Sequence, residues 1–181
     1  WSQVATNDTY IVAKADEGKK IRSVLSYTDG QGFSETVNTS ASTIPYLNDG
    51  AASFSITGTA AVGETLTIQE DSADPDGTGT LSYNWQTSSD ENTWSQVGTS
   101  STYTVASTDE GKGIRSVLSY TDSQGFSEEV TTIAEGRLHV PYVDDGDATF
   151  SISGTAAIGQ TLSITETSAD PDQGTGQLLY Y

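Results

Sequence analysis

The chain contains no cysteine and no methionine among its 181 residues. Without cysteine, it can form no disulfide bond, no zinc–thiolate site and no thiol nucleophile. Small secreted animal domains usually depend on disulfides, so a secreted protein of this composition is more typical of bacteria. Any core in this chain must therefore be held together by apolar packing alone.

Positive charge is also scarce. Lys and Arg total 7 against 25 Asp and Glu, which gives a formal net charge of -18. A surface this negative repels phosphate backbones and anionic lipids, so we expect no nucleic-acid partner. The carboxylates must either face water or bind cations. Calcium, which is abundant outside cells, suits their hard oxygen atoms.

The sequence offers little catalytic chemistry. Its single histidine, His139, lies beside Pro141. It has no glycine-rich phosphate-binding motif followed by a helix. Asp74 and Asp76 form a carboxylate pair of the general kind that hydrolyses glycosides, but they lie in a turn of a repeated segment, where a copied active site would be unusual. We expect no enzymatic activity.

Long apolar runs are absent as well. No stretch approaches the roughly 20 residues that cross a bilayer, and the N-terminal residues do not have the pattern of a signal peptide. We therefore expect no membrane insertion within this segment. We expect any export signal and anchor of an extracellular parent protein to lie outside it.

Internal repetition is the strongest signal in the sequence. WSQVATNDTY at Trp1 returns as WSQVGTSSTY at Trp94, and PYLNDG at Pro45 returns as PYVDDG at Pro141. The separations are 93 and 96 positions. A period of about 95 residues is too long for a solenoid unit and matches a single sandwich domain. The sequence predicts separate domains in tandem.

The repeat divides the chain into three predicted parts. Residues 1–44 are the C-terminal half of one repeat, 45–140 a complete repeat, and 141–181 the N-terminal half of a third. Half domains leave open sheet edges and exposed apolar faces. Either the chain is an excerpt of a longer polymer, which we favour, or the half domains complete one another between neighbouring chains.

The complete repeat contains seven short alternating segments and no helical periodicity. Leu81, Tyr83 and Trp85, for example, fall on one face of a strand. The predicted strands cover residues 54–58, 64–69, 81–85, 93–97, 102–105, 114–120 and 126–130. Gly, Asp, Ser and Pro separate them, as in turns. This pattern predicts an all-β, Ig-like antiparallel sandwich.

In a sandwich of this strand order, three acidic clusters meet at each junction between repeats. The loop between the second and third strands returns to the end where the first strand begins, and the loop before the sixth strand lies at the opposite end. The upstream junction then gathers Asp16, Glu17, Asn48, Asp49, Asp74 and Asp76, and the downstream junction gathers Asp109, Glu110, Asp144, Asp145, Asp170 and Asp172.

These clusters predict a calcium site at each junction, because Ca²⁺ takes about 6 to 8 oxygen ligands. Without a cation the charges would repel and splay the repeats apart. The alternative is that Asp, Asn and Gly simply make good surface turns. Glu64 is a weaker candidate ligand because Gln160 replaces it in the next copy. Asp122 and its equivalent Asp29 are also lesser candidates.

Several motifs carry a family resemblance. They are SITGTAAVG from Ser55, SADPDG from Ser72, LSYNWQ from Leu81, DEGKGIR from Asp109 and SYTDSQG from Ser119. Together they resemble the tandem Ig-like repeats of giant bacterial surface proteins, many of which are adhesins or matrix proteins. The Asn48-Asp49-Gly50 linker and the Asp74-x-Asp76 pair are also similar to cadherin junctions. That resemblance implies Ca²⁺ bound between domains.

Two functions follow as expectations. The first is a calcium-stiffened structural repeat of an extracellular stalk, filament or matrix, with neighbouring repeats and other copies as partners. The second is an adhesive module that binds glycans or neighbouring copies, including by strand exchange between half domains. For glycans, Trp94 is the aromatic residue expected to be exposed. We expect Trp85 and Tyr83 to lie in the core, since they share a face with Leu81.

Overall fold

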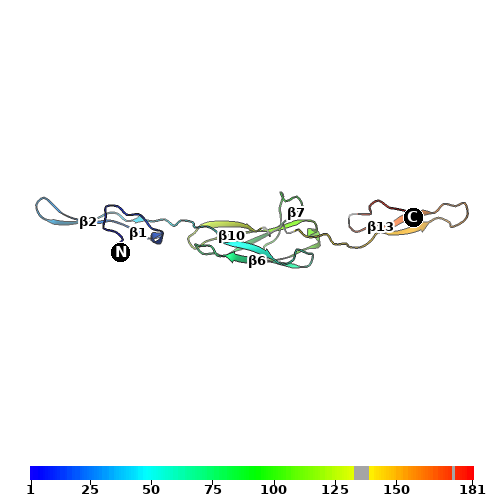
Figure 1. Ribbon diagram of the computed structural model, residues 1–181, viewed down its shortest axis with the longest axis horizontal. Coiled ribbons are helices and arrows are strands. Elements are labelled where there is room, and N and C mark those ends of the chain that lie inside the picture. The colour runs from blue at the N-terminus through cyan, green and yellow to red at the C-terminus, as the bar shows by residue number, and fades with distance from the viewer. Residues whose placement is uncertain (133–138, 173) are drawn as a thin grey trace.

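The computed structural model describes residues 1–132, 139–172 and 174–181. These residues are nearly all β, with two short 3-10 turns, η1 (Lys14–Asp16) and η2 (Ser107–Asp109). Figure 1 shows three parts in a row, in which N-terminal and C-terminal parts flank a central part. Within the described ranges, no helix has the length and apolar character needed to span a membrane.

The central part consists of two antiparallel sheets. The first has the order β5-β6-β9 and is formed by β5 (Ser53–Thr57), β6 (Thr65–Ser72) and β9 (Thr102–Thr104). The second has the order β11-β10-β7-β8 and is formed by β7 (Ser82–Ser88), β8 (Ser95–Gly98), β10 (Gly113–Thr121) and β11 (Ser127–Thr132). The predicted all-β class is confirmed.

The two sheets enclose an apolar core. Leu66 of the first sheet and Trp85 and Leu118 of the second are each 0% exposed. Along β10, every second side chain from Ile114 to Tyr120 is buried, as the period of a strand requires. The indole N–H of Trp85 donates to the Ser100 carbonyl at 2.9 Å, so its one polar atom is satisfied. Trp85 is a core residue, as predicted.

The outer parts contain hairpins that repeat those of the centre. In the N-terminal part, β1 (Lys20–Ile21) pairs with β4 (Ser42–Thr43), and β2 (Val24–Thr28) pairs with β3 (Ser34–Asn38). In the C-terminal part, β12 (Thr149–Ser153) pairs with β13 (Ser163–Ser168). The registers also repeat, since Tyr27 lies opposite Glu35 as Tyr120 lies opposite Glu128.

Each linker is attached to the part that precedes it by the same contact. A Cβ added to Gly18 would lie 2.2 Å from the Tyr46 hydroxyl oxygen, and one added to Gly111 would lie 2.2 Å from that of Tyr142. Both glycines have φ near +70° (+70° and +69°), which glycine adopts readily. The Gly111 N–H also donates to the Val140 carbonyl at 2.9 Å. Glycine in the Asp-Glu-Gly turn therefore lets the linker tyrosine pack directly on the backbone.

Candidate metal centre

Three carboxylates converge at the upstream end of the central part, the end that adjoins the linker from the N-terminal part. One oxygen atom from each of Asp74, Asp122 and Glu128 lies within 4.8 Å of the others. Asp74 follows β6, Asp122 follows β10, and Glu128 belongs to β11. Asp74 is 4% exposed and Asp122 is 6% exposed. The cluster therefore joins a loop from one sheet to a hairpin of the other.

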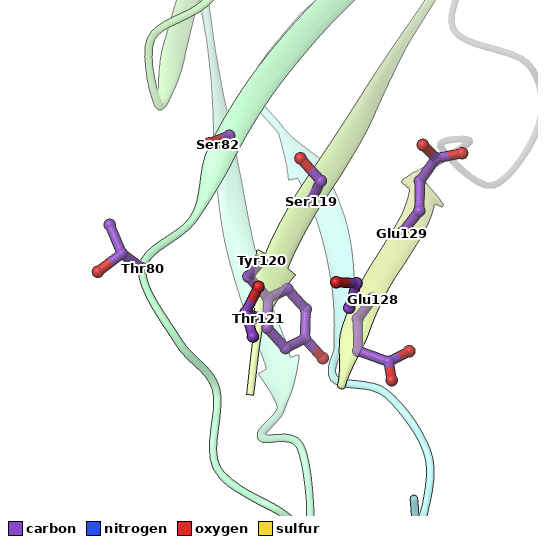
Figure 2. A pocket seen from close by; sticks show the side chains of 8 residues that line it. Thr80, Ser82, Ser119, Tyr120, Thr121, Glu128 and Glu129 are labelled. Atoms are coloured by element: carbon purple, nitrogen blue, oxygen red, sulfur yellow. The ribbon is translucent and has the colours of Figure 1, made fainter. Parts of the chain in front are cut away.

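The strand register explains the position of Glu128. It lies opposite Tyr120 in the β10–β11 pair, and residues directly opposite in an antiparallel pair share a face. Figure 2 shows the Tyr120 and Glu128 side chains extending toward the same end of these strands. Glu128 is thus an inward-facing carboxylate at the margin of the core.

Asp122 has one oxygen atom occupied by a turn and one without a hydrogen-bond partner. Its Oδ1 accepts the backbone N–H groups of Gln124, Gly125 and Phe126 at 2.8, 2.6 and 2.9 Å. Its Oδ2 is buried and accepts no hydrogen bond. The amide oxygen of Gln124 is also buried without a partner. Buried polar atoms usually have a hydrogen-bond partner, so these two oxygens are free to accept one from a ligand.

The Tyr120 hydroxyl ties the cluster to the linker. It donates to Asp74 Oδ2 at 2.6 Å and accepts the Ala52 N–H at 2.7 Å. Burial, and then the hydrogen bond to Asp74, raises the pKa of Tyr120 to about 12. The hydroxyl therefore stays neutral and continues to donate at physiological pH.

Replacing Tyr120 with phenylalanine should lower the free energy of unfolding by about 1–3 kcal/mol, because the Ala52 N–H and Asp74 both lose a buried partner. Urea unfolding followed by far-UV circular dichroism measures this change. Thr121→Ala, at an exposed neighbouring position, is the control and should change stability by less than about 0.5 kcal/mol. Equal losses in the two variants would contradict the bridging role of the hydroxyl.

The linker lies on this cluster through side-chain and backbone contacts. The Asp49 N–H donates to Asp76 Oδ2 at 2.7 Å, and the Asn48 amide donates to Glu128 Oε1 at 2.5 Å. The Asp76 N–H donates in turn to Asp74 Oδ1 at 2.7 Å. The predicted linker residues and the predicted loop residues therefore do meet at the upstream junction.

A lysine from the preceding part also reaches this junction. The ammonium group of Lys14 forms an ion pair with Asp49. Its hydrogen bond to Asp49 is the main cause of a raised pKa of Lys14, and the charges of Glu17 and Asp76 raise the pKa further. Alignment of the repeats places Ser107 at the equivalent downstream position. Lys14 thus gives the upstream junction a positive charge that the downstream junction lacks.

Asp16 and Asp109 make hydrogen bonds within their own parts. Asp109 accepts hydrogen bonds from the Tyr103 hydroxyl and the Ala106 N–H. Asp16 makes the same contacts with Tyr10 and Ala13, and the Tyr10 hydrogen bond is the main cause of a lowered pKa of Asp16. Each carboxylate closes its 3-10 turn.

The downstream junction repeats part of the upstream geometry. The Asp145 N–H donates to Asp172 Oδ2 at 3.1 Å, as Asp49 does to Asp76. Glu110 accepts the Val143 N–H at 3.5 Å. Asp144 Oδ1 accepts the Gly146 N–H at 3.1 Å, and Asp170 Oδ1 accepts the Asp172 N–H at 2.9 Å. The downstream linker therefore contacts the Asp170–Asp172 loop through Asp145.

The aromatic residues considered for sugar binding are partly covered. Trp85 is buried and stacks on Tyr103 with 5.7 Å between ring centroids. Trp94 is half-buried, and the Arg115 guanidinium lies 4.1 Å from its ring centroid. The two tryptophans therefore do not form a shared open platform.

Neither the family models nor the curated proteins contain a match for this chain.

Proposed function

We propose that this chain is a structural segment of a long extracellular bacterial surface protein or filament, built from Ig-like repeats whose junctions are stiffened by calcium. The strand order supports the Ig-like assignment. The third, sixth and seventh strands of the central part, β7, β10 and β11, are neighbours in one sheet, while the first and second, β5 and β6, lie in the other. Ig sandwiches divide their strands in this way.

The observation that carries the calcium proposal is the buried, unpartnered Oδ2 of Asp122 beside Asp74 and Glu128. Negative charges this close repel one another, and a hard divalent cation would relieve that repulsion. The available donors are carboxylate and amide oxygens, which Ca²⁺ prefers. Asp74, Asp122 and Glu128 would bind the ion, with the Gln124 amide oxygen as a further ligand.

This position suits a stiffening role because the linker is attached on both sides. Tyr46 packs on Gly18 of the N-terminal part, and Asn48 and Asp49 bond to Glu128 and Asp76 of the central part. An ion that fixes Glu128 and Asp74 also fixes the groups that hold the linker. The strong negative charge and the lack of cysteine agree with a secreted bacterial protein.

Small-angle X-ray scattering of the full chain tests this function. We expect a larger maximum dimension and a narrower range of conformations with calcium than with a chelator, because the ion restrains the junction. Asp122→Asn should remove the difference. Asp90→Asn, in a turn away from this cluster, is the control and should keep the wild-type response. Identical wild-type profiles with calcium and with chelator would refute the stiffening role.

A further inference from the structure

Asp49 in the upstream linker contacts both of the parts that this linker joins. Its N–H donates to Asp76 Oδ2 of the central part at 2.7 Å, and its carboxylate forms an ion pair with the ammonium group of Lys14 in the N-terminal part. Among the residues that the structure describes, this ion pair is the only polar contact of the buried Asp49 Oδ2 atom. Lys14 therefore balances a charge that water does not reach.

The η1 turn brings Lys14 to the linker. Lys14 is the first residue of this turn, and the Gly18 N–H just after the turn donates to the Ile44 carbonyl at 3.0 Å. Lys14 also lines a surface hollow together with Pro45 and Leu47. The turn thus lies beside the start of the linker, and a lysine at its first position reaches the linker carboxylate.

The two charges of the ion pair differ in their exposure to water. The Lys14 side chain is 68% exposed and the Asp49 side chain is 19% exposed. Exposed ion pairs contribute little to stability, but removing the partner of a buried charge is costly because that charge is left uncompensated. Without Lys14, the Asp49 carboxylate would have to turn toward water, and this movement would disturb the N–H contact of the same residue with Asp76.

The downstream junction has the same framework without the lysine. Ser107 begins η2 as Lys14 begins η1, and Asp145 occupies the position of Asp49. The contact between the linker tyrosine and the turn glycine is present at both junctions. A serine side chain is short and uncharged, so it does not compensate a linker carboxylate. The difference between the junctions is therefore one of residue type at a single position of the turn.

We propose that Lys14 acts as a tethered cation that holds the upstream junction aligned without a metal ion, and that a junction with serine at this position lacks this restraint. A cation carried by the chain needs no free ion, so the restraint is present at any calcium concentration. A row of repeats would then contain stiffer and more compliant junctions according to this one residue. The restraint acts through Asp49 and does not depend on the proposed calcium site.

Double electron–electron resonance on the full chain in chelator tests the proposal. The chain has no cysteine, so spin labels on cysteines introduced at the exposed positions Asn38 and Thr99 report only the distance across the upstream junction. Lys14→Ser should broaden this distance distribution and shift it to shorter values, because the junction bends more freely. Serine is compatible with the turn, since Ser107 occupies the same position in η2.

Two further variants separate the ion pair from other effects of the substitution. Lys14→Arg keeps the positive charge and should keep a distribution close to that of the wild type. Lys20→Ser removes the same charge from the adjacent strand β1, and it should leave the distribution unchanged. An unchanged distribution in Lys14→Ser would overturn the proposal. Equal broadening in Lys14→Arg or in Lys20→Ser would also overturn it, because the effect would then not come from the charge at position 14.

A calcium titration of the same labelled proteins distinguishes this proposal from the proposed function. Broadening by Lys14→Ser in chelator, with no narrowing when calcium is added, supports the tethered cation and counts against calcium stiffening. Narrowing by calcium, with no effect of Lys14→Ser in chelator, supports calcium stiffening and overturns the tethered cation. If both are correct, calcium should narrow the distribution of the wild type and of the variant, and the variant should remain the broader of the two.

Discussion

Replacing Trp85 with alanine should lower the free energy of unfolding of the central part by about 3–5 kcal/mol. Trp85 is 0% exposed and belongs to the core cluster between the two sheets, with Leu66, Val105 and Ile114. The substitution removes apolar contacts and leaves a cavity, and it also leaves the Ser100 carbonyl without its indole partner. No disulfide holds the sheets together, so nothing else offsets the loss of apolar packing at this position.

Urea unfolding followed by far-UV circular dichroism measures the loss, because this signal does not depend on tryptophan emission. Trp94→Ala is the matched control. Trp94 is half-buried under Arg115, so its loss should cost only about 1 kcal/mol. A domain of this size has a stability of about 5–15 kcal/mol. If Trp85→Ala does not fold, Trp85→Phe should show an intermediate loss, and equal effects at positions 85 and 94 would contradict this account of the core.

The strands and the core were predictable because they follow from short-range patterns. Alternation placed Leu81, Tyr83 and Trp85 on one face, and each of the seven predicted segments overlaps a strand of the structure. Topology also placed the Asp74 loop at the upstream end of the central part, where the Asp49 N–H reaches Asp76. The strand positions follow from the alternation of apolar residues, and the end at which each loop lies follows from the order of the strands. Both can be read from the sequence.

The side chains at the junction were less predictable, because their direction depends on packing. Asp16 and Asp109 were predicted to face the linker, and each instead accepts a hydrogen bond from a tyrosine of its own part. Glu128 was not predicted as a candidate, although its place opposite Tyr120 in an alternating strand was available as a signal. Asp122 is only a minor candidate from the sequence, although its turn follows the sixth strand and the same topology places it at the end of the Asp74 loop.

Two substitutions between the junctions change their electrostatic balance. Upstream, Lys14 supplies a fixed positive charge to Asp49. Downstream, Ser107 occupies that position, and Asp144 replaces Asn48. The downstream junction is therefore the more negative of the two. The upstream ion pair is made with Asp49 and not with Asp74, Asp122 or Glu128.

Calcium should stabilise the central part by about 4 kcal/mol when the ion is present at about 1,000 times its dissociation constant, if it binds the folded state alone. Asp122→Asn should lose most of this gain because it removes the carboxylate with the unpartnered oxygen. In chelator the same substitution should leave stability unchanged or slightly higher, since three close negative charges become two. The variant should thus be at least as stable as the wild type without calcium and less stable than the wild type with calcium.

Urea unfolding of both proteins, in chelator and across a calcium titration, measures this reversal in their relative stability. Asp90→Asn is the control, because Asp90 lies in a turn away from the cluster and binds backbone N–H groups that bring its pKa to about 2. Its substitution should cost the same with and without calcium. A wild-type midpoint that calcium does not move would refute metal binding, and a full calcium gain in Asp122→Asn would place the ion elsewhere. A smaller gain in magnesium is also expected, because Mg²⁺ demands near-octahedral geometry and keeps several of its waters.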